Sequence, residues 1–204
     1  NKPPGIAVNG NRFRTVENAL LGELGPTDEP DRLPWARPVH RLDSPTGGLL
    51  LVARTAGASV SLGRQFQERQ IAKRYRTVVT GRTDERGVIS IPLDGQEAIT
   101  EYTLVRCVPS IKNGWLSLLD VRPLTGSTHQ IRRQMAACGH PVLGDRTYGA
   151  EGMILRSKGL FLWAVELSFV HPVDGNTMDI SIDMPPKFTT FLDREERRWK
   201  RYNA

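Results

Sequence analysis

The dipeptide Asn113-Gly114 lies between two runs rich in apolar and β-branched residues, residues 100–108 and 115–121. Asn and Gly tolerate a positive φ better than other residues, so this pattern predicts a β-hairpin that turns at Asn113-Gly114. Similar runs predict strands at residues 48–53, 75–80, 87–93, 160–170 and 178–184. Helices are expected at residues 16–24, 58–70, 129–137 and 193–202. Because hairpin-linked strands outnumber helices, we expect an α+β fold with a largely antiparallel sheet.

The chain of 204 residues is long enough for a proper core in one domain, or in two closely joined lobes. Residues 26–38 are rich in Pro and Asp and are expected to form a loop. No run of 18 apolar residues is present, so we expect no membrane partner. Cys107 and Cys138 have neither metal-ligand spacing nor a disulfide framework, which favours a reducing compartment. The start at Asn1 leaves both the cytoplasm and an organelle (mitochondrion or plastid) open, since a targeting segment can be removed.

The net charge of +6, with a pI near 9.7, comes mostly from arginine. Arginine forks onto phosphate and stacks on bases, so this balance favours a nucleic-acid partner. The expected C-terminal helix adds a basic run of Arg194, Arg197, Arg198, Lys200 and Arg201. This basic helix is expected to be either a solvated helix or an arm that contacts RNA.

Asp43 lies in a turn, residues 43–48, directly before an apolar run. A carboxylate fixed at the end of a strand, with cations nearby, is a candidate nucleophile or general base. The alternative is a solvated turn, because Asp-Ser-Pro-Thr-Gly-Gly is also good turn chemistry.

Other segments carry groups that belong with such a site. The cations Lys73 and Arg74 precede Tyr75 at the start of a strand. Residues 125–133 lead into a helix, with Ser127 or Thr128 as the expected cap. No P-loop and no Gly-x-Ser-x-Gly elbow is present, and the four histidines lack metal spacing.

The order of these segments resembles the RluA-type family of RNA pseudouridine synthases. The family signature His-Arg-Leu-Asp-x-x-Thr-x-Gly-Leu-Leu matches residues 40–50, and its opening Asn-Lys-Pro-x-Gly matches residues 1–5. Further family motifs match Lys73 and Tyr75 and residues 125–132, 139–149 and 164–172. The chain departs from the usual pattern at four positions, which hold Gly47 in place of Ser, Ser127 in place of Arg, Gln134 in place of His and Trp163 in place of His.

The resemblance implies a single pseudouridine synthase catalytic domain over residues 1–204, with a mixed or antiparallel bent sheet flanked by helices and an active-site cleft across the sheet. It also implies that the family's first strand lies before residue 1 and that this sequence holds no S4 domain. The catalytic residues would be Asp43, Tyr75 and Arg132, with Arg132 beside Asp43. The substrate and RNA contacts would be Arg41, His40, Lys73, Arg74, His129, Ile131, Arg133 and Leu162.

The implied reaction flips a uridine out of the RNA, cleaves its N1–C1′ bond and rejoins the base through C5. Asp43 would attack C1′ or the uracil ring, or promote elimination at the ribose. No metal or organic cofactor is expected. The partner would be ribosomal or transfer RNA, alone or in a ribosomal subunit or assembly intermediate, bound by a monomer. Two rival functions are an inactive RNA-binding assembly factor with this fold and a base- or sugar-processing hydrolase.

Overall fold

A computed structural model describes residues 1–11, 13–21, 28–149 and 158–204. The chain forms two compact units, each built from separate segments. Residues 1–73 and 166–182 make unit 1, and residues 74–165 and 183–204 make unit 2. No helix in the described ranges is long and apolar enough to cross a lipid bilayer. The prediction of one domain over the whole chain stays a prediction.

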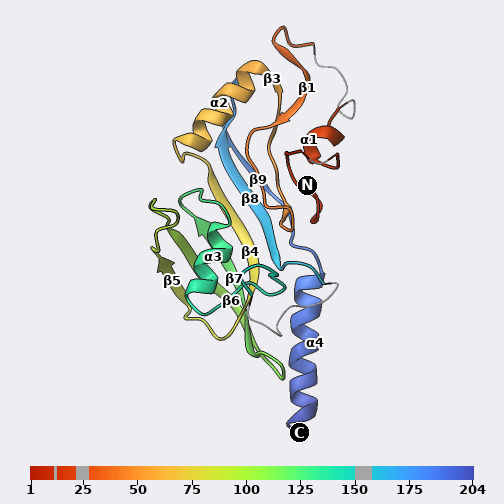
Figure 1. Cartoon of the computed structure of the whole chain (residues 1–204), viewed down its shortest axis with the longest axis vertical. Helices are drawn as coiled ribbons and strands as arrows, with labels where there is room; N and C mark the ends of the chain where they lie inside the picture. The colour runs from red at the N-terminus through yellow and green to blue at the C-terminus, as the bar shows by residue number, and fades with distance from the viewer. Residues whose placement is uncertain (12, 22–27, 150–157) are drawn as a thin grey trace. The chain divides into compact units, whose positions relative to one another are not determined.

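Unit 2 contains four strands joined in the antiparallel order β4-β7-β6-β5 (Figure 1). These are β4 (Ala72–Thr80, which begins in unit 1), β7 (Gly114–Pro123), β6 (Thr100–Ser110) and β5 (Arg86–Ile89). The predicted hairpin is confirmed, because β6 pairs with β7 and Ser110 lies opposite Gly114. Gly114 has a φ of 68°, the left-handed conformation that favours Gly at this turn.

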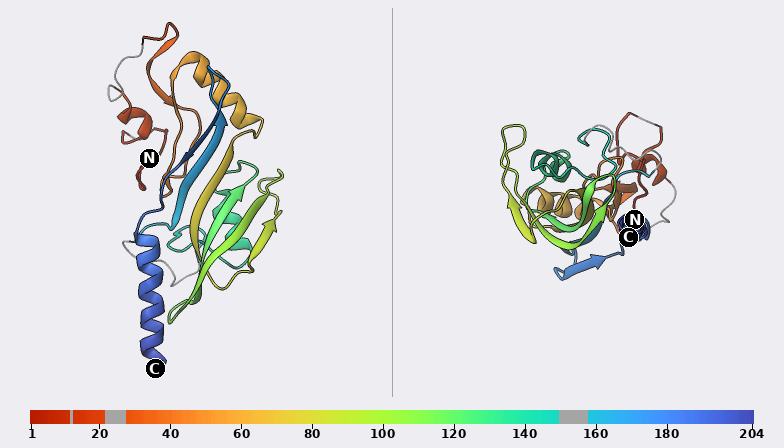
Figure 2. Two further views of the ribbon diagram at one scale, coloured as in Figure 1. Left: turned by 180° about the vertical axis from the view of Figure 1, so that it is seen from behind. Right: turned by 90° about the horizontal axis from the view of Figure 1, so that it is seen from below.

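One face of these strands packs on α3 (Gln130–Ala137), as Figure 2 shows on its right. Val79, Leu119 and Val121 from the strands join Ile131 and Met135 from the helix in one buried cluster. The two helix residues are four apart and therefore lie on one face, as the sequence predicts. This cluster fixes α3 against the sheet, and with it the residues at the start of the helix.

The second helix of unit 2 is α4 (Lys187–Tyr202). Its apolar N-terminal half is anchored by Phe188 and Phe191, whose rings lie 5.1 and 5.2 Å from that of Phe161. The helix is longer than the predicted span of residues 193–202, because Phe188 and Leu192 are fully buried and extend its packing toward the N-terminus.

Unit 1 holds the short α1 (Val16–Ala19), the helix α2 (Ala56–Gln67), and the strands β1 (Arg32–Pro38), β2 (Gly47–Gly48), β3 (Val52–Thr55) and β9 (Thr177–Ser181). β8 (Leu162–Val170) runs through both units, and its residues 166–170 pair antiparallel with β9. In the core of unit 1, Leu62 of α2 packs against Leu167 and Phe169 of β8. Strands and helices together confirm the α+β class.

Two local predictions in unit 1 are wrong. Residues 32–38 form β1 rather than a loop, because β1 pairs with β3 alone and such an edge strand tolerates its prolines. The strand expected at residues 48–53 is divided between β2 and β3. The predicted helix at residues 16–24 is confirmed only as α1, and its residues 22–24 lie outside the described ranges, as do residues 26–27 of the expected loop.

Candidate active site

In unit 1, Asp43 begins a tight turn at the surface. The backbone N–H of Thr46 donates to the Asp43 carbonyl oxygen at 3.0 Å, which closes the turn. Asp43 is half-buried and Arg41 is exposed, while Leu42 between them is buried. Anchoring Leu42 in the unit's interior leaves the two charged side chains at the surface.

Lys2 anchors this turn through hydrogen bonds to Ser44 and Gly48. The sequence did not identify it as a site residue. It pairs with Gly48 through two backbone hydrogen bonds of 2.7 and 3.0 Å. Its Nζ donates to the carbonyl oxygens of Pro3, Ile6 and Ser44 at 3.0, 2.7 and 3.2 Å. Burial lowers the pKa of Lys2 to about 8, and the negative charge of Asp43 opposes that shift. The ammonium group therefore fixes the residue next to Asp43 and feels the Asp43 carboxylate.

His40 connects the two ends of the same loop. The Leu51 backbone N–H donates to His40 Nε2 at 2.9 Å, and the imidazole ring stacks on Phe66 at 4.4 Å. Burial, followed by the charge of Lys73, lowers the pKa of His40 to about 4. The ring is therefore neutral at neutral pH and acts as a hydrogen-bond acceptor. A role for His40 in binding RNA stays a prediction.

Lys73 is the last residue of the first segment of unit 1. Burial, followed by the positive charge of Arg69, lowers the pKa of Lys73. A half-buried ammonium group of this kind gains from a nearby phosphate, so its predicted contact with RNA agrees with its surroundings.

In unit 2, helix α3 begins without the predicted cap. His129 holds the N-cap position with a φ of 55°, and neither Ser127 nor Thr128 caps the helix through its side chain. Gln130 instead holds the loop that precedes the helix: its Oε1 accepts from Thr125 Oγ1 at 2.7 Å and from the Ser127 backbone N–H at 3.0 Å. The polar loop is therefore held by the first residue inside the helix.

Arg132 lies in the first turn of α3 and is almost fully buried. Its Nε and Nη2 donate to the two carboxylate oxygens of Asp145 at 2.7 and 2.8 Å. Asp145 also accepts from the backbone N–H groups of Thr147 and Tyr148 at 2.9 and 3.2 Å. Despite burial, which acts in the opposite direction, these bonds lower the pKa of Asp145 and keep it ionised.

Tyr148 completes the surroundings of Arg132. The Arg132 guanidinium carbon lies 5.1 Å from the centre of the Tyr148 ring, and the Tyr148 hydroxyl lies 2.9 Å from His129 Nδ1. The bonds to Asp145 use one edge of the guanidinium, and the tyrosine covers a face. Arg132 is thus oriented in advance.

Tyr75, Ile131 and Leu162 all lie in unit 2, and their contact with a base stays a prediction. Ile131 and Leu162 are members of the buried cluster under α3, and the half-buried Tyr75 packs against the same cluster. Three residues assigned to the base therefore belong to or pack against one buried cluster, and Ile131 directly precedes Arg132 in α3.

Two predicted RNA-binding arginines have acidic partners within unit 2. Arg133 makes two bonds to Asp94 at 2.7 and 3.0 Å. Arg74 shares Asp120 with Arg76, at 3.3 and 2.6 Å. Because each arginine is already paired with a carboxylate, an RNA phosphate would have to compete with that carboxylate. Both arginines are also only partly exposed.

The predicted site residues therefore fall into two groups. Unit 1 carries His40, Arg41, Asp43 and Lys73, and unit 2 carries Arg74, Tyr75, His129, Ile131, Arg132, Arg133 and Leu162. The ion pair expected between Asp43 and Arg132 stays a prediction. Sequence reasoning missed Asp145, Tyr148, Gln130 and Lys2 as site residues, although Asp145 and Tyr148 lie in the matched motif of residues 139–149.

One family departure has a structural explanation. Gln134 is fully buried, and its Nε2 donates to the carbonyl oxygens of Ile91 and Ala98 at 3.0 and 2.8 Å. The side chain ties α3 to the segment between β5 and β6, so its role is to hold the helix in place.

A family profile described as RNA pseudouridylate synthase matches residues 1–137. Ribosomal large subunit pseudouridine synthase D of Zymomonas mobilis is 36% identical over 217 residues, covering 91% of this chain and 65% of that protein. The dual-specificity RNA pseudouridine synthase RluA of Haemophilus influenzae is 31% identical, with 87% of this chain and 84% of that protein covered. The chain belongs to the RluA-type family of RNA pseudouridine synthases.

A solved structure supports the same fold. Human RNA pseudouridylate synthase domain containing 1 superposes with a TM-score of 0.75 at 26% identity, covering 95% of this chain and 81% of that one. The chain spans slightly less than two thirds of the length of several curated relatives, at 65–66%.

Proposed function

We propose that this protein converts uridine to pseudouridine in RNA. The observation that carries the proposal is the buried pair Arg132–Asp145, which orients a cation next to Ile131, a member of the cluster that also holds Leu162 and packs against Tyr75. A flipped uracil needs a flat apolar surface and a fixed charge nearby, and base–aromatic stacking contributes about 1–3 kcal/mol per base.

In this reaction the N1–C1′ bond breaks, the base turns, and a C5–C1′ bond forms. The C5 proton leaves and N1 takes up a proton, so the product is an isomer of the substrate. Asp43 supplies the carboxylate that acts on the ribose or the uracil ring, and the proposed role of Arg132 is to keep that carboxylate ionised and oriented. Tyr75 stacks on the base, and its hydroxyl assists removal of the C5 proton.

The proposed substrates are ribosomal or transfer RNA, and a relative named for the ribosomal large subunit supports the first of these. The basic composition of the chain agrees with a polyanionic substrate. The experiment is to incubate the protein with cellular RNAs and map pseudouridine, with Asp43→Asn as the control.

A further inference from the structure

The outer end of α4 and the β6–β7 turn form an aromatic hollow. It has a volume of about 370 Å³ and is lined by Trp115 and Ile111 near the turn and by Trp199 and Tyr202 of α4. The exposed fractions of the three aromatic residues are 40% for Trp115, 37% for Trp199 and 77% for Tyr202. Large aromatic faces gathered at a surface mark a binding site rather than a core.

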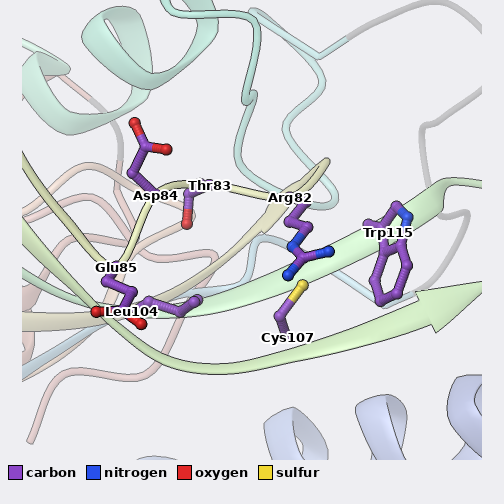
Figure 3. A pocket seen from close by; sticks show the side chains of 7 residues that line it. All are labelled: Arg82, Thr83, Asp84, Glu85, Leu104, Cys107 and Trp115. Atoms are coloured by element: carbon purple, nitrogen blue, oxygen red, sulfur yellow. The ribbon is translucent and has the colours of Figure 1, made fainter.

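A second hollow, also with a volume of about 370 Å³, shares Trp115 with the first (Figure 3). Here Arg82 points along the indole, with its guanidinium carbon 5.4 Å from the ring centre. Trp115 lines both hollows, so the aromatic hollow adjoins one that is lined by Arg82 together with Asp84 and Glu85.

The charge of α4 favours a polyanion at this surface. The helix holds six Lys or Arg residues and three carboxylates. All three carboxylates bond to β6: Asp193 and Glu196 to Arg106 at 2.6 Å each, and Glu195 to Ser110 at 2.8 Å. These bonds fix the helix along β6 and direct its acidic groups toward the protein.

Four arginines of α4 have exposed side chains, and one of them, Arg198, also bonds to Glu195 at 3.4 Å. Arg194, Arg197, Arg198 and Arg201 are exposed, and their spacing of three and four residues places them on one helical stripe. Arg201, the last arginine of the stripe, directly precedes Tyr202, which lines the aromatic hollow. A protein interface usually has few charges at its centre, whereas single-stranded RNA binds where a basic track adjoins aromatic side chains.

From these observations we infer that the outer end of α4 and the β6–β7 turn bind unpaired nucleotides of RNA, with bases stacked on Trp115, Trp199 and Tyr202 and phosphates held by the arginine stripe. The inference deepens the proposed function, on which it rests for RNA as the ligand. It assigns the C-terminal helix a role in holding RNA that flanks the modified uridine.

The test is binding of the full chain to a short oligoadenylate, which contains no uridine for the catalytic site. Tyr202→Ala is expected to weaken binding at least about fivefold, because one stacked base is lost. Arg197→Ala combined with Arg201→Ala is expected to reduce the slope of log affinity against log salt by about 1.4. Matched controls are Phe13→Ala, at a side chain 91% exposed, and Arg14→Ala combined with Arg64→Ala, all outside the proposed surface.

Tryptophan fluorescence provides a readout specific to stacking. Oligoadenylate is expected to quench the emission of the wild-type protein, and Trp115→Phe combined with Trp199→Phe to lose most of that quenching. Thermal melting checks that each variant is folded. Affinity, salt slope and quenching equal to those of the wild type in all surface variants would overturn the inference.

Two further outcomes are decisive. If the surface variants change the sedimentation of the protein but leave oligoadenylate binding intact, the surface joins two copies of the chain and the inference is wrong. If the wild type forms no pseudouridine but the surface variants lose oligoadenylate binding, the proposed function fails and this inference stands. Pseudouridine formation together with unchanged oligoadenylate binding in the variants would reject only the inference.

Discussion

Arg132 and Asp145 form a two-point ion pair inside unit 2, with donor–acceptor distances of 2.7 and 2.8 Å. Their side chains are 4% and 0% exposed. The pair joins the first turn of α3 to residues 145–148, whose backbone N–H groups and tyrosine ring surround it. The orientation of the proposed catalytic arginine therefore depends on a residue that touches no substrate in the proposed mechanism.

Asp145→Asn is expected to lower the free energy of unfolding by about 3–5 kcal/mol, because it leaves a buried arginine without its counter-charge. It should also abolish turnover in the fraction that folds. Urea unfolding measures the first effect. The matched control is Asp94→Asn, which breaks the more exposed pair with Arg133 and should lower the free energy of unfolding far less. Equal losses in the two variants would show that the buried pair does not stabilise the fold.

Acidification should destabilise unit 1 through His40. The pKa of His40 is about 4 in the folded chain and near 6.5 when unfolded, so the unfolded state binds more protons between those values. The free energy of unfolding is therefore unaffected by His40 titration above about pH 6.5. It decreases as the pH drops toward about 4, by at most about 3 kcal/mol.

His40→Gln isolates that effect, because the glutamine carbonyl can accept the Leu51 N–H without titrating. Unfolding free energies of the variant should depend less on pH over the same range. A pH dependence as steep as that of the wild type would assign the effect to other groups.

Lys2→Met should reduce turnover about tenfold to hundredfold with little change in KM for RNA. The ammonium group holds the Ser44 carbonyl oxygen, and its loss releases the turn that carries Asp43. Lys158→Met removes an exposed lysine and serves as the control. A Lys2→Met enzyme with normal turnover would show that the Asp43 turn keeps its geometry without this anchor.

The two roles proposed for Tyr75 separate in two variants. Tyr75→Phe keeps the ring, so RNA affinity should hold while turnover falls about 10²-fold or more through loss of the acid–base group. Tyr75→Leu removes the stacking face as well and should weaken RNA binding at least about fivefold. Single-turnover rates and equilibrium binding distinguish these effects. Full turnover in Tyr75→Phe would exclude the hydroxyl from the chemistry.

The predictions that the structure confirms depend on local properties of the sequence, namely turn preference and residue spacing. The turn at Asn113-Gly114 is fixed by conformational preference, and the inner face of α3 follows from the spacing of Ile131 and Met135. β1 was missed because its prolines read as loop unless the strand is known to lie at an edge.

The missed site residues depend on contacts between distant segments. Arg132 meets Asp145 thirteen positions later, across a loop that has no periodic pattern. The sequence does not show that His40 is buried and near Lys73, and these two causes lower its pKa to about 4. His129, in a left-handed conformation, holds the N-cap position of α3 that the local sequence favours for Ser127 or Thr128.

Pseudouridine mapping on cellular RNAs treated with the wild type and with Asp43→Asn tests the central claim most directly. The wild type should form pseudouridine at defined uridines, and Asp43→Asn should form none while still binding RNA, because the amide cannot act as the carboxylate. Pseudouridine formation by Asp43→Asn at the wild-type rate would contradict the mechanism, and RNA binding without modification by the wild type would contradict the proposed activity.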